Sequence, residues 1–253
     1  MADNWILLRG LIRESRHWED FVQTFQARFP GDTVIAVDLP GNGTRWQERS
    51  PAFIEDMVAS LRTSLSDRGL QPPFNVLALS LGAMTAISWL NDYPGEVGRA
   101  VLLNTSVARF SPFWQRLQAA NYWRILRHGL FARTALRKEQ MILSITSNLR
   151  TETERAQIAA RWAGYASERP VSRGNALRQI VAAARFSAPA TLPATVPVLV
   201  LNGGGDRLVS PACSAALASG WGLPLSVHPR AGHDLTLDDG PWAADQVRQW
   251  MTP

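Results

Sequence analysis

Cysteine and long apolar runs are nearly absent from this chain of 253 residues. Cys213 is the only cysteine, which excludes an internal disulfide and a zinc site built from cysteines. Because disulfides are typical of oxidising compartments, a lone thiol favours a reducing one, and we expect a cytoplasmic protein. No stretch approaches the roughly 18 apolar residues of a membrane span, and the opening MADNW does not resemble a signal peptide, so neither a span nor export is expected.

Lysine is also scarce, since Lys138 is the single lysine among 26 basic residues. The formal net charge is +5, but residues 107–190 hold fourteen basic and only four acidic side chains. Two interpretations of this basic segment stay open: it is a solvated, arginine-rich helix surface, or it receives an anionic partner such as an acyl carrier protein or coenzyme A. No nucleic-acid recognition motif accompanies the charge, so we expect no nucleic-acid partner.

Short apolar runs rich in Val, Leu and Ile alternate with helical patterns along most of the chain. The runs are WILLRG (5–10), TVIAVDLP (33–40), FNVLALS (74–80), RAVLLNT (99–105), VPVLVLNG (196–203) and LPLSVHP (223–229). Such runs are typical of strands covered on both faces, and they predict a mainly parallel sheet of about six strands. Helical spacing is found at 15–29, 51–68, 83–93, 210–219 and 239–251. The alternation predicts a doubly wound α/β fold.

Strand patterns are missing from residues 107–190. Four helices are predicted there, at about 112–128, 131–148, 152–167 and 172–186. Thr151 and Glu154 have the spacing of a capping box for the third of them. We therefore expect an all-helical cap (lid) at 107–190, inserted in an α/β core made of 1–106 and 191–253.

The stretch NVLALSLGAMTA (75–86) changes from strand to helix character at Ser80. Ala78 and Gly82 lie two residues to either side, and both are small, as a tight turn from a strand into a helix requires. Such a turn projects the serine hydroxyl from the carboxyl edge of the sheet, where open α/β sheets bind ligands. Ser80 is thus a candidate nucleophile, although a small packing residue on a non-catalytic binding protein is the alternative.

A serine nucleophile needs a histidine base, and the chain has only four histidines. His17 and His128 lie in predicted helices and His228 closes a predicted strand, so these three are expected to be surface or packing residues. His233 lies in the loop between the last strand and the last helix, at the carboxyl edge of the sheet. His233 is therefore the candidate base, with a plain loop residue as the alternative.

The base in turn needs a carboxylate to orient it. Asp206 follows a strand end in GGGDRL, where three glycines allow a sharp turn. The order Ser80, Asp206, His233 is that of nucleophile-elbow hydrolases. Asp206 has the alternative roles of capping the next helix or pairing with Arg207. The carboxylates close to His233 in sequence are expected to serve the N-terminus of the last helix instead: Asp234, Asp238 and Asp239.

Acyl transfer also needs backbone N–H donors for the oxyanion. The amide of Leu81 directly follows Ser80 at a helix N-terminus, which favours negative charge. The second donor is expected in the loop after the first strand, and we assign it to Leu11, which follows Gly10.

These motifs resemble those of the α/β-hydrolase superfamily, in its lidded, serine-dependent, esterase- or thioesterase-like form. The matching pieces span about 5–251 and are LLRG (7–10), VDLPGNG (37–43), LSLGAM (79–84), GGGDRLVSP (203–211) and AGHDL (231–235). The resemblance implies a Ser-His-Asp mechanism with neither cofactor nor metal. Two positions depart from the family pattern. Ala78 stands where glycine is usual, and Arg9 stands where a histidine supports the oxyanion loop. We expect Arg9 to supply the missing hydrogen bonds and to pair with Glu14.

The predicted function is hydrolysis of a carboxylic ester or thioester of an apolar acyl group, through an acyl-enzyme on Ser80. A thioesterase or methyl-esterase that docks acyl carrier protein or coenzyme A on the basic cap is one alternative, and a non-catalytic ligand-binding protein is another. Three aromatic residues near the start of the cap are expected to form an apolar pocket wall: Phe110, Phe113 and Trp114.

Overall fold

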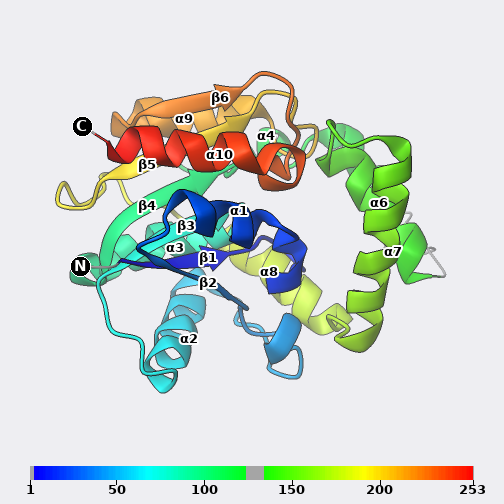
Figure 1. Ribbon diagram of the computed structural model, residues 1–253, viewed down its shortest axis with the longest axis horizontal. Helices are drawn as coiled ribbons and strands as arrows, with labels where there is room; N and C mark the ends of the chain where they lie inside the picture. The colour runs from blue at the N-terminus through cyan, green and yellow to red at the C-terminus, as the bar shows by residue number, and fades with distance from the viewer. Residues whose placement is uncertain (1–2, 124–133, 253) are drawn as a thin grey trace.

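The sheet is the centre of the molecule. In the computed structural model, which describes residues 3–123 and 134–252, six strands form one sheet in the order β2-β1-β3-β4-β5-β6 (Figure 1). The strands are β1 (Asn4–Leu8), β2 (Thr33–Val37), β3 (Phe74–Leu79), β4 (Val97–Leu103), β5 (Val198–Gly203) and β6 (Leu225–His228). Every neighbouring pair is parallel, which confirms the predicted fold class.

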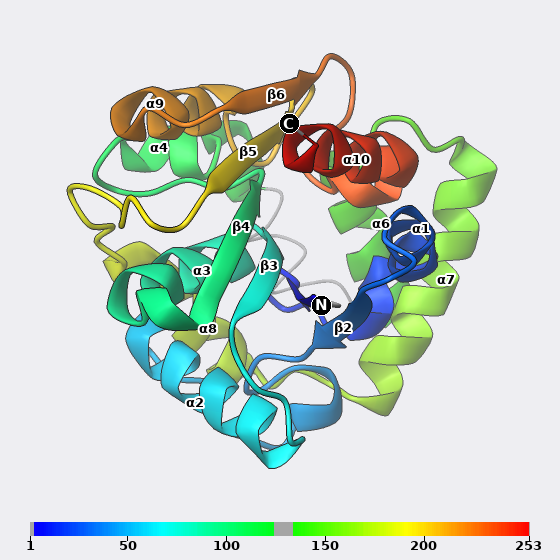
Figure 2. The same ribbon diagram turned by 60° about the vertical axis from the view of Figure 1, so that its left-hand side comes forward.

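Both faces of the sheet are covered, as the unbroken apolar runs predicted. In β1, Trp5 and Leu7 pack into one core and Ile6 and Leu8 into the other, and all four are fully buried. Helices α1 (Phe21–Arg28) and α10 (Leu235–Met251) cover the first face, side by side (Figure 2). Helices α2 (Ile54–Asp67), α3 (Leu81–Asp92) and α9 (Pro211–Trp221) cover the second.

Three short 3-10 turns, η1 (Ser15–Trp18), η2 (Gly43–Arg45) and η3 (Pro94–Glu96), lie in the loops. The helical pattern predicted over 15–29 is split into η1 and α1, because Glu19 between them has a positive φ of 51°. The last helix begins earlier than the predicted 239–251 but is kinked at Asp239, whose φ and ψ are −147° and 77°. Pro241 accounts for this kink, since it has no N–H to donate to the carbonyl of Leu237, four residues earlier, and its ring clashes with that carbonyl in a continuous helix.

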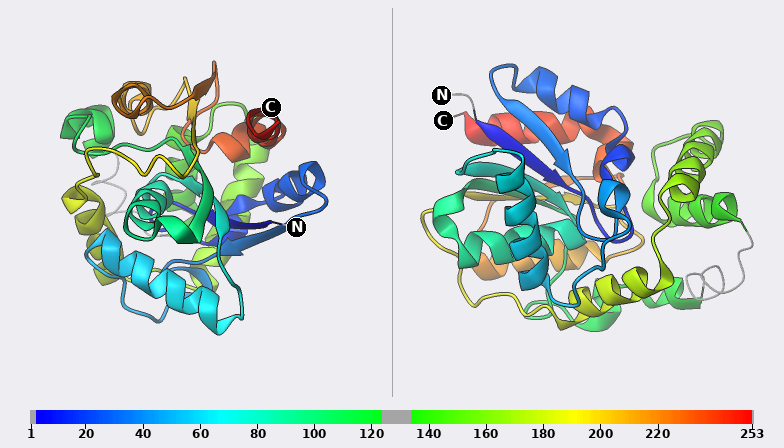
Figure 3. Two further views of the ribbon diagram at one scale, coloured as in Figure 1. Left: turned by 90° about the vertical axis from the view of Figure 1, so that its left-hand side faces the viewer. Right: turned by 90° about the horizontal axis from the view of Figure 1, so that it is seen from below.

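In its described part, the segment between β4 and β5 contains helices joined by loops and no strand. It contains α4 (Phe113–Arg116), η4 (Ala119–Asn121), α6 (Ala135–Thr146), α7 (Glu152–Glu168) and α8 (Arg173–Arg185). The capping box of Thr151 and Glu154 at the start of α7 is present. In Figure 1, α6 and α7 stand beyond the ends of the strands toward which the arrows point, and the right-hand view of Figure 3 shows α8, in yellow-green, running from the end of α7 back toward the α/β core.

The continuous helix predicted at 112–128 is wrong over its described part. Helix α4 ends at Arg116, and Leu117 is extended, with φ −138° and ψ 114°. The physical reason is tertiary: the backbone N–H of Gln118 donates to Leu208 O at 2.9 Å, and its side chain donates to Asp206 O at 2.9 Å. These bonds hold the chain against the β5–α9 loop instead of within a helix. The rest of this prediction, with His128, lies outside the described residues.

Helices α6 and α7 pack on one another and on the loop after β1. Trp162 of α7 is fully buried, and its indole N–H donates to Glu19 Oε1 at 2.6 Å. The guanidinium of Arg13 lies 4.8 Å from the Trp162 ring and pairs with Glu139 of α6 at 2.8 Å.

Among the described residues, no helix has the length and apolar character that crossing a membrane requires.

Candidate active site

Ser80 has the strained backbone that a nucleophile elbow requires. Its φ is 58° and its ψ −113°, which is costly for any residue except glycine, by roughly 1–3 kcal/mol. Two hydrogen bonds hold this conformation at the end of β3: Ser80 N donates to Leu103 O at 3.0 Å, and Thr105 Oγ1 donates to Ser80 O at 3.0 Å. Helix α3 begins at the next residue, and the Ser80 side chain is partly exposed.

Glycine is required two residues after Ser80, because α3 passes close to the end of β1. A Cβ at Gly82 would lie 2.5 Å from Leu8 O and 2.7 Å from Arg9 O, which is too close for any side chain. At position 78 alanine is sufficient, since Ala78 is fully buried within the core and needs only to be small.

Two free N–H groups lie on either side of Ser80. Gly10 is packed against the serine, since a Cβ placed on Gly10 would lie 3.1 Å from Ser80 Cβ. The backbone N–H of Leu11, the next residue, has no acceptor among the described residues, and neither has the N–H of Leu81 at the start of α3. Unpaired N–H groups in this position are able to receive a developing negative charge.

Asp206 and His233 are brought together at the ends of β5 and β6. His233 Nδ1 donates to Asp206 Oδ2 over 2.7 Å, and both side chains are buried. The other carboxylate oxygen, Asp206 Oδ1, accepts from Leu208 N at 2.8 Å and from Val209 N at 2.9 Å. Since a carboxylate surrounded by donors acts only as an acceptor, we assign the Nδ1–H tautomer to the histidine, which leaves Nε2 available as a base.

Asn104 is a residue that the sequence prediction missed. It is fully buried at the end of β4 with φ 43°, and its Nδ2 donates to Asp206 Oδ2 at 3.0 Å and to Gly232 O at 3.1 Å. Its Oδ1 accepts from Gly203 N at 3.2 Å. Asn104 thus ties the acid to the loop that carries His233. The feature of the sequence that could have indicated Asn104 is an amide side chain directly after the apolar run VLL, at the end of a predicted strand.

The segment Asn104–Thr105 connects the two halves of the site. Thr105 is bonded to Ser80 O, while Asn104 is bonded to Gly232 O, next to His233. No hydrogen bond joins Ser80 Oγ to the His233 imidazole in the part of the chain that the structure describes. In free enzymes such bonds are often long and shorten when substrate binds.

The prediction that Arg9 pairs with Glu14 is wrong. Arg9 Nη1 donates to Asp234 Oδ1 at 3.0 Å and Nη2 to Asp234 Oδ2 at 2.5 Å, and both residues are buried. Glu14 is bonded to Arg16 instead. Burial by itself raises the pKa of the Asp234 carboxyl, but the charge and hydrogen bonds of Arg9 outweigh burial and hold that pKa below its ordinary value.

The other two carboxylates after His233 have separate roles. Asp238 lies in the first turn of α10, as expected, and its carboxylate also accepts from Gly232 N at 2.7 Å and from Ser147 Oγ at 2.6 Å, which joins the His233 loop to the loop between α6 and α7. Asp239 accepts from Trp242 N at 3.0 Å and does start the second part of α10, as expected.

The remaining described histidines are packing residues, as predicted. His17 is buried between the rings of Trp162 and Tyr165, with centroids at 4.8 and 5.6 Å. Burial, and then the positive charges of Arg13 and Arg9, hold the pKa of His17 well below its ordinary value. His228 is buried against Trp242 and accepts the N–H of Ala231 at 2.9 Å.

The aromatic residues proposed as a pocket wall have their ring contacts away from the triad. Phe113 is 68% and Trp114 55% exposed, and their rings touch each other at 5.2 Å. Phe110 packs on α9, with its ring 5.1 Å from that of Trp221. A pocket wall built from these three residues stays a prediction that their contacts do not support.

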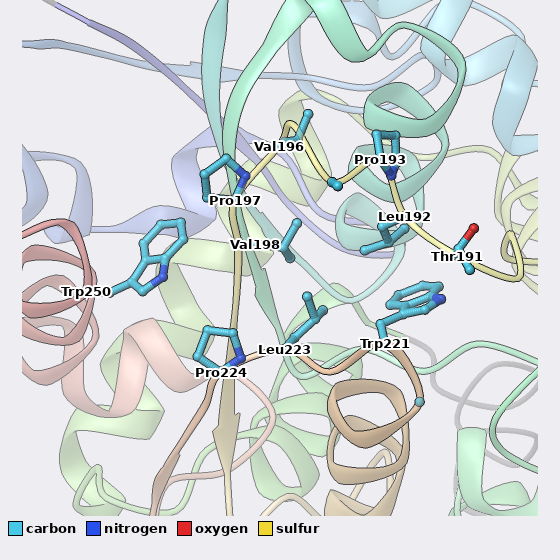
Figure 4. A pocket seen from close by; sticks show the side chains of 12 residues that line it. Thr191, Leu192, Pro193, Val196, Pro197, Val198, Trp221, Leu223, Pro224 and Trp250 are labelled. Atoms are coloured by element: carbon cyan, nitrogen blue, oxygen red, sulfur yellow. The ribbon is translucent and has the colours of Figure 1, made fainter.

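A cavity of about 430 Å³ lies at the opposite edge of the sheet from Ser80. Figure 4 shows Trp221 and Trp250 on two sides of it, with Val198, the first residue of β5, between them. Because the cavity borders the amino end of β5, it is separate from the candidate active site. A second hollow of about 300 Å³ lies on the surface beside α2.

A parallel sheet with a serine at the turn after β3 and an aspartate and histidine after the last two strands defines the class of α/β-hydrolase proteins. A sequence model described as the alpha/beta hydrolase family matches residues 5–246, and the chain therefore belongs to this family. The likeness in shape agrees with this assignment. An enol-lactonase from Burkholderia xenovorans LB400 superposes with a TM-score of 0.78 at 16% identity, over 100% of this chain and 92% of that one.

Other similar proteins have different activities. A thermophilic esterase from Thermogutta terrifontis gives a TM-score of 0.75 at 18% identity, covering 99% of this chain and 90% of its own. In sequence, a homoserine O-acetyltransferase from Pelobacter propionicus is 31% identical over 38% of this chain, and one from Geobacter sulfurreducens is 27% identical over 51%. The matches span only 26% and 35% of those two relatives.

Proposed function

We propose that the protein is a serine hydrolase that cleaves a carboxylic ester or thioester of an apolar acyl group. The observation that carries this proposal is the hydrogen bond of 2.7 Å between His233 and Asp206 on the same sheet edge as the strained Ser80. Family membership supports it, because the family contains many hydrolases, and serine at the turn fits an acyl-enzyme.

In the proposed reaction Ser80 Oγ attacks the carbonyl carbon while His233 Nε2 takes its proton. The N–H groups of Leu11 and Leu81 stabilise the oxyanion of the tetrahedral intermediate. His233 then gives the proton to the leaving alcohol or thiol, and the acyl group stays on Ser80. A water molecule, activated by the same imidazole, attacks the acyl-enzyme and releases the acid. Asp206 holds the imidazole in the required tautomer throughout.

The test is hydrolysis of short-chain p-nitrophenyl esters by the wild type and by Ser80→Ala. We expect the variant to lose activity by about 10³-fold or more, because the residual rate then depends on binding and the oxyanion donors alone. His233→Ala is expected to match it, since the two residues act as a unit. Equal rates in the wild type and in Ser80→Ala would show that the ester cleavage does not use this site, and would favour a non-catalytic binding role.

The same acyl-enzyme is able to pass its acyl group to an alcohol other than water. The partial similarity to homoserine O-acetyltransferases motivates one added arm of the assay, in which the wild type receives homoserine beside the ester. For a hydrolase, we expect the free acid to remain the main product. If acyl-homoserine is the main product instead, the protein is an acyltransferase and the proposed hydrolase function is wrong.

The contacts of five cap arginines favour a small-molecule substrate over the alternative in which the basic cap docks an anionic carrier. Several cap arginines are used within the molecule itself. Three donate to backbone carbonyls of Ala188, Ala183 and Ser50: Arg109, Arg116 and Arg178. Two form ion pairs with Glu154 and Glu19: Arg150 and Arg161. We therefore assign these arginines to the packing of the cap, and propose a small-molecule substrate.

A further inference from the structure

The loop proposed to hold the oxyanion contains a strained residue next to its donor. Ile12 directly follows Leu11, and its φ is 58°. A β-branched residue rarely adopts this left-handed conformation, which costs on the order of 1–3 kcal/mol and persists only where the surroundings enforce it. Something must therefore hold the Ile12 backbone in place.

The group that holds Ile12 comes from a distant part of the chain. The backbone N–H of Ile12 donates to Gln179 Oε1 at 2.9 Å, and Gln179 belongs to α8, in the segment between β4 and β5. The Gln179 side chain is only 1% exposed. A buried acceptor at this distance satisfies the Ile12 N–H, which has no backbone acceptor among the described residues.

The orientation of the Gln179 amide is fixed by its other partners. Its Nε2 donates to Asn42 Oδ1 and to Ser50 Oγ, both at 3.0 Å. Ser50 Oγ donates its own hydrogen bond to Pro40 O at 2.7 Å, so it acts as an acceptor toward Gln179. With both acceptors on the nitrogen side, the amide oxygen has to face Ile12. The loop after β2 thus holds Gln179, and Gln179 holds the loop after β1.

We propose that Gln179 is a positioning residue for the oxyanion hole: its carbonyl oxygen keeps Ile12 in the left-handed conformation that aims the Leu11 N–H toward the substrate. This inference rests on the proposed function. According to this inference, the oxyanion is stabilised only while α8, a helix of the cap, stays packed against the loop after β1. Displacement of α8 therefore weakens catalysis although it leaves the triad unchanged.

The chain offers a matched control on the same helix. Asn175 lies one turn before Gln179, is also buried, and also bonds the loop after β2: it accepts from Ser50 N and donates to Glu48 O, each at 2.9 Å. Within the described residues, Asn175 makes no hydrogen bond to the loop after β1. If Gln179 only holds α8 against the core, substitution of either residue has the same effect on activity. If Gln179 positions the oxyanion loop, only its substitution lowers kcat.

The experiment compares Gln179→Met with Asn175→Leu in ester hydrolysis. Removal of a whole oxyanion donor costs about 10²–10³-fold in kcat, so misplacement of one donor is expected to cost about tenfold. For Gln179→Met we expect this loss in kcat with KM unchanged, and the same factor in the inhibition constant of a trifluoromethyl ketone, which forms an oxyanion adduct with serine. Asn175→Leu removes a bond to Ser50 N but keeps Gln179 and both of its acceptors, so we expect kcat and ketone inhibition within about twofold of the wild type, whatever its loss of thermal stability.

A rescue experiment tests the role of backbone strain. Glycine adopts a φ of 58° without penalty, so Ile12→Gly is expected to restore most of the kcat lost in Gln179→Met. If Gln179→Met does not fold, Asn42→Ala takes its place. This variant removes one of the two acceptors that orient the Gln179 amide and leaves Ser50 Oγ in place, so we expect a smaller loss, a twofold to threefold lower kcat.

An unchanged kcat in Gln179→Met, or in Asn42→Ala where that variant takes its place, would overturn the inference. A loss of kcat in Asn175→Leu equal to that in Gln179→Met would also overturn it. In both cases the proposed function stands. Equal activity of Ser80→Ala and the wild type is a different outcome, and it would overturn the proposed function itself.

Discussion

The buried ion pair between Arg9 and Asp234 allows the most detailed prediction. It joins the residue before Gly10 to the residue after His233, and neither side chain is more than 5% exposed. Replacement of Arg9 by methionine keeps much of the apolar stem, but it removes the guanidinium that lies 4.8 Å from the centroid of the Trp18 ring and leaves the Asp234 carboxylate without its counter-charge. Breaking a buried pair from one side costs about 3–5 kcal/mol, so we expect Arg9→Met to lower the free energy of unfolding by that amount at pH 7.

The pH dependence follows from the sign of the Asp234 shift. In the wild type its pKa is lowered on folding, so its stabilisation is present above the ordinary pKa of about 3.9 and is lost only as the pH falls through the still lower folded value. In Arg9→Met the guanidinium no longer opposes burial, which is the largest influence on the pKa of Asp234, and only the charges of His233 and Arg13 still lower that pKa. We expect burial to prevail and to raise the pKa above its ordinary value, so that the folded state binds a proton more tightly than the unfolded state. Its stability then increases as the pH is lowered from 7 toward 4, and the difference from the wild type becomes smaller.

Urea unfolding of the wild type, Arg9→Met, Asp234→Leu and the double variant at several pH values between 4 and 7 measures both effects. The double variant is expected to be more stable than Arg9→Met, because removal of both charges leaves no unpaired buried group. A loss below about 0.5 kcal/mol in Arg9→Met, which is what an ordinary surface substitution gives, would refute the reasoning. A pH-independent difference would refute the part that concerns Asp234.

Three further predictions concern other residues. Asn104→Leu is expected to lower kcat by about tenfold or more with little change in KM, because the acid and the His233 loop lose their common donor; steady-state kinetics decides this, and unchanged kcat would count against it. Gly82→Ala is expected to destabilise the fold by several kcal/mol, roughly 2–4, because its Cβ would meet Leu8 O at 2.5 Å, and a melting temperature equal to that of the wild type would contradict this. Because the pKa of His17 is lowered in the folded state, its neutral form stabilises the protein above about pH 6.5, and this contribution is lost as the pH falls below that value. His17→Phe should flatten the dependence of unfolding free energy on pH between about 6.5 and 5, and an unaltered slope would exclude His17 as its source.

The fold could be predicted from the sequence because its signals are local. Each strand appears as an apolar run bounded by turn residues, and a parallel sheet buried on both faces needs no further information to be recognised. The same holds for the order of Ser80, Asp206 and His233, since each follows a strand end and the carboxyl ends of parallel strands share one edge. The helix predicted at 112–128 failed where local preference lost to bonds from Gln118 to residues about 90 positions away.

The partners of individual polar groups could not be predicted in the same way. Arg9 was expected to pair with nearby Glu14, but it pairs with Asp234, which is 225 positions away. Asn104 was missed because an amide at a strand end has no distinctive neighbours in sequence, although it contacts both Asp206 and Gly232 in space.

The sequence by itself determined the parallel sheet, the helical segment between β4 and β5, and the edge at which Ser80, Asp206 and His233 lie. These features follow from the spacing of apolar and turn residues along the chain, which is a local property. Only the tertiary structure decided that Arg9 holds the His233 loop through Asp234, and that Gln179 of α8 holds the loop of Leu11. The physical reason is that a buried polar group must find a partner wherever the fold brings one, and that partner is fixed by packing in space and not by distance along the chain.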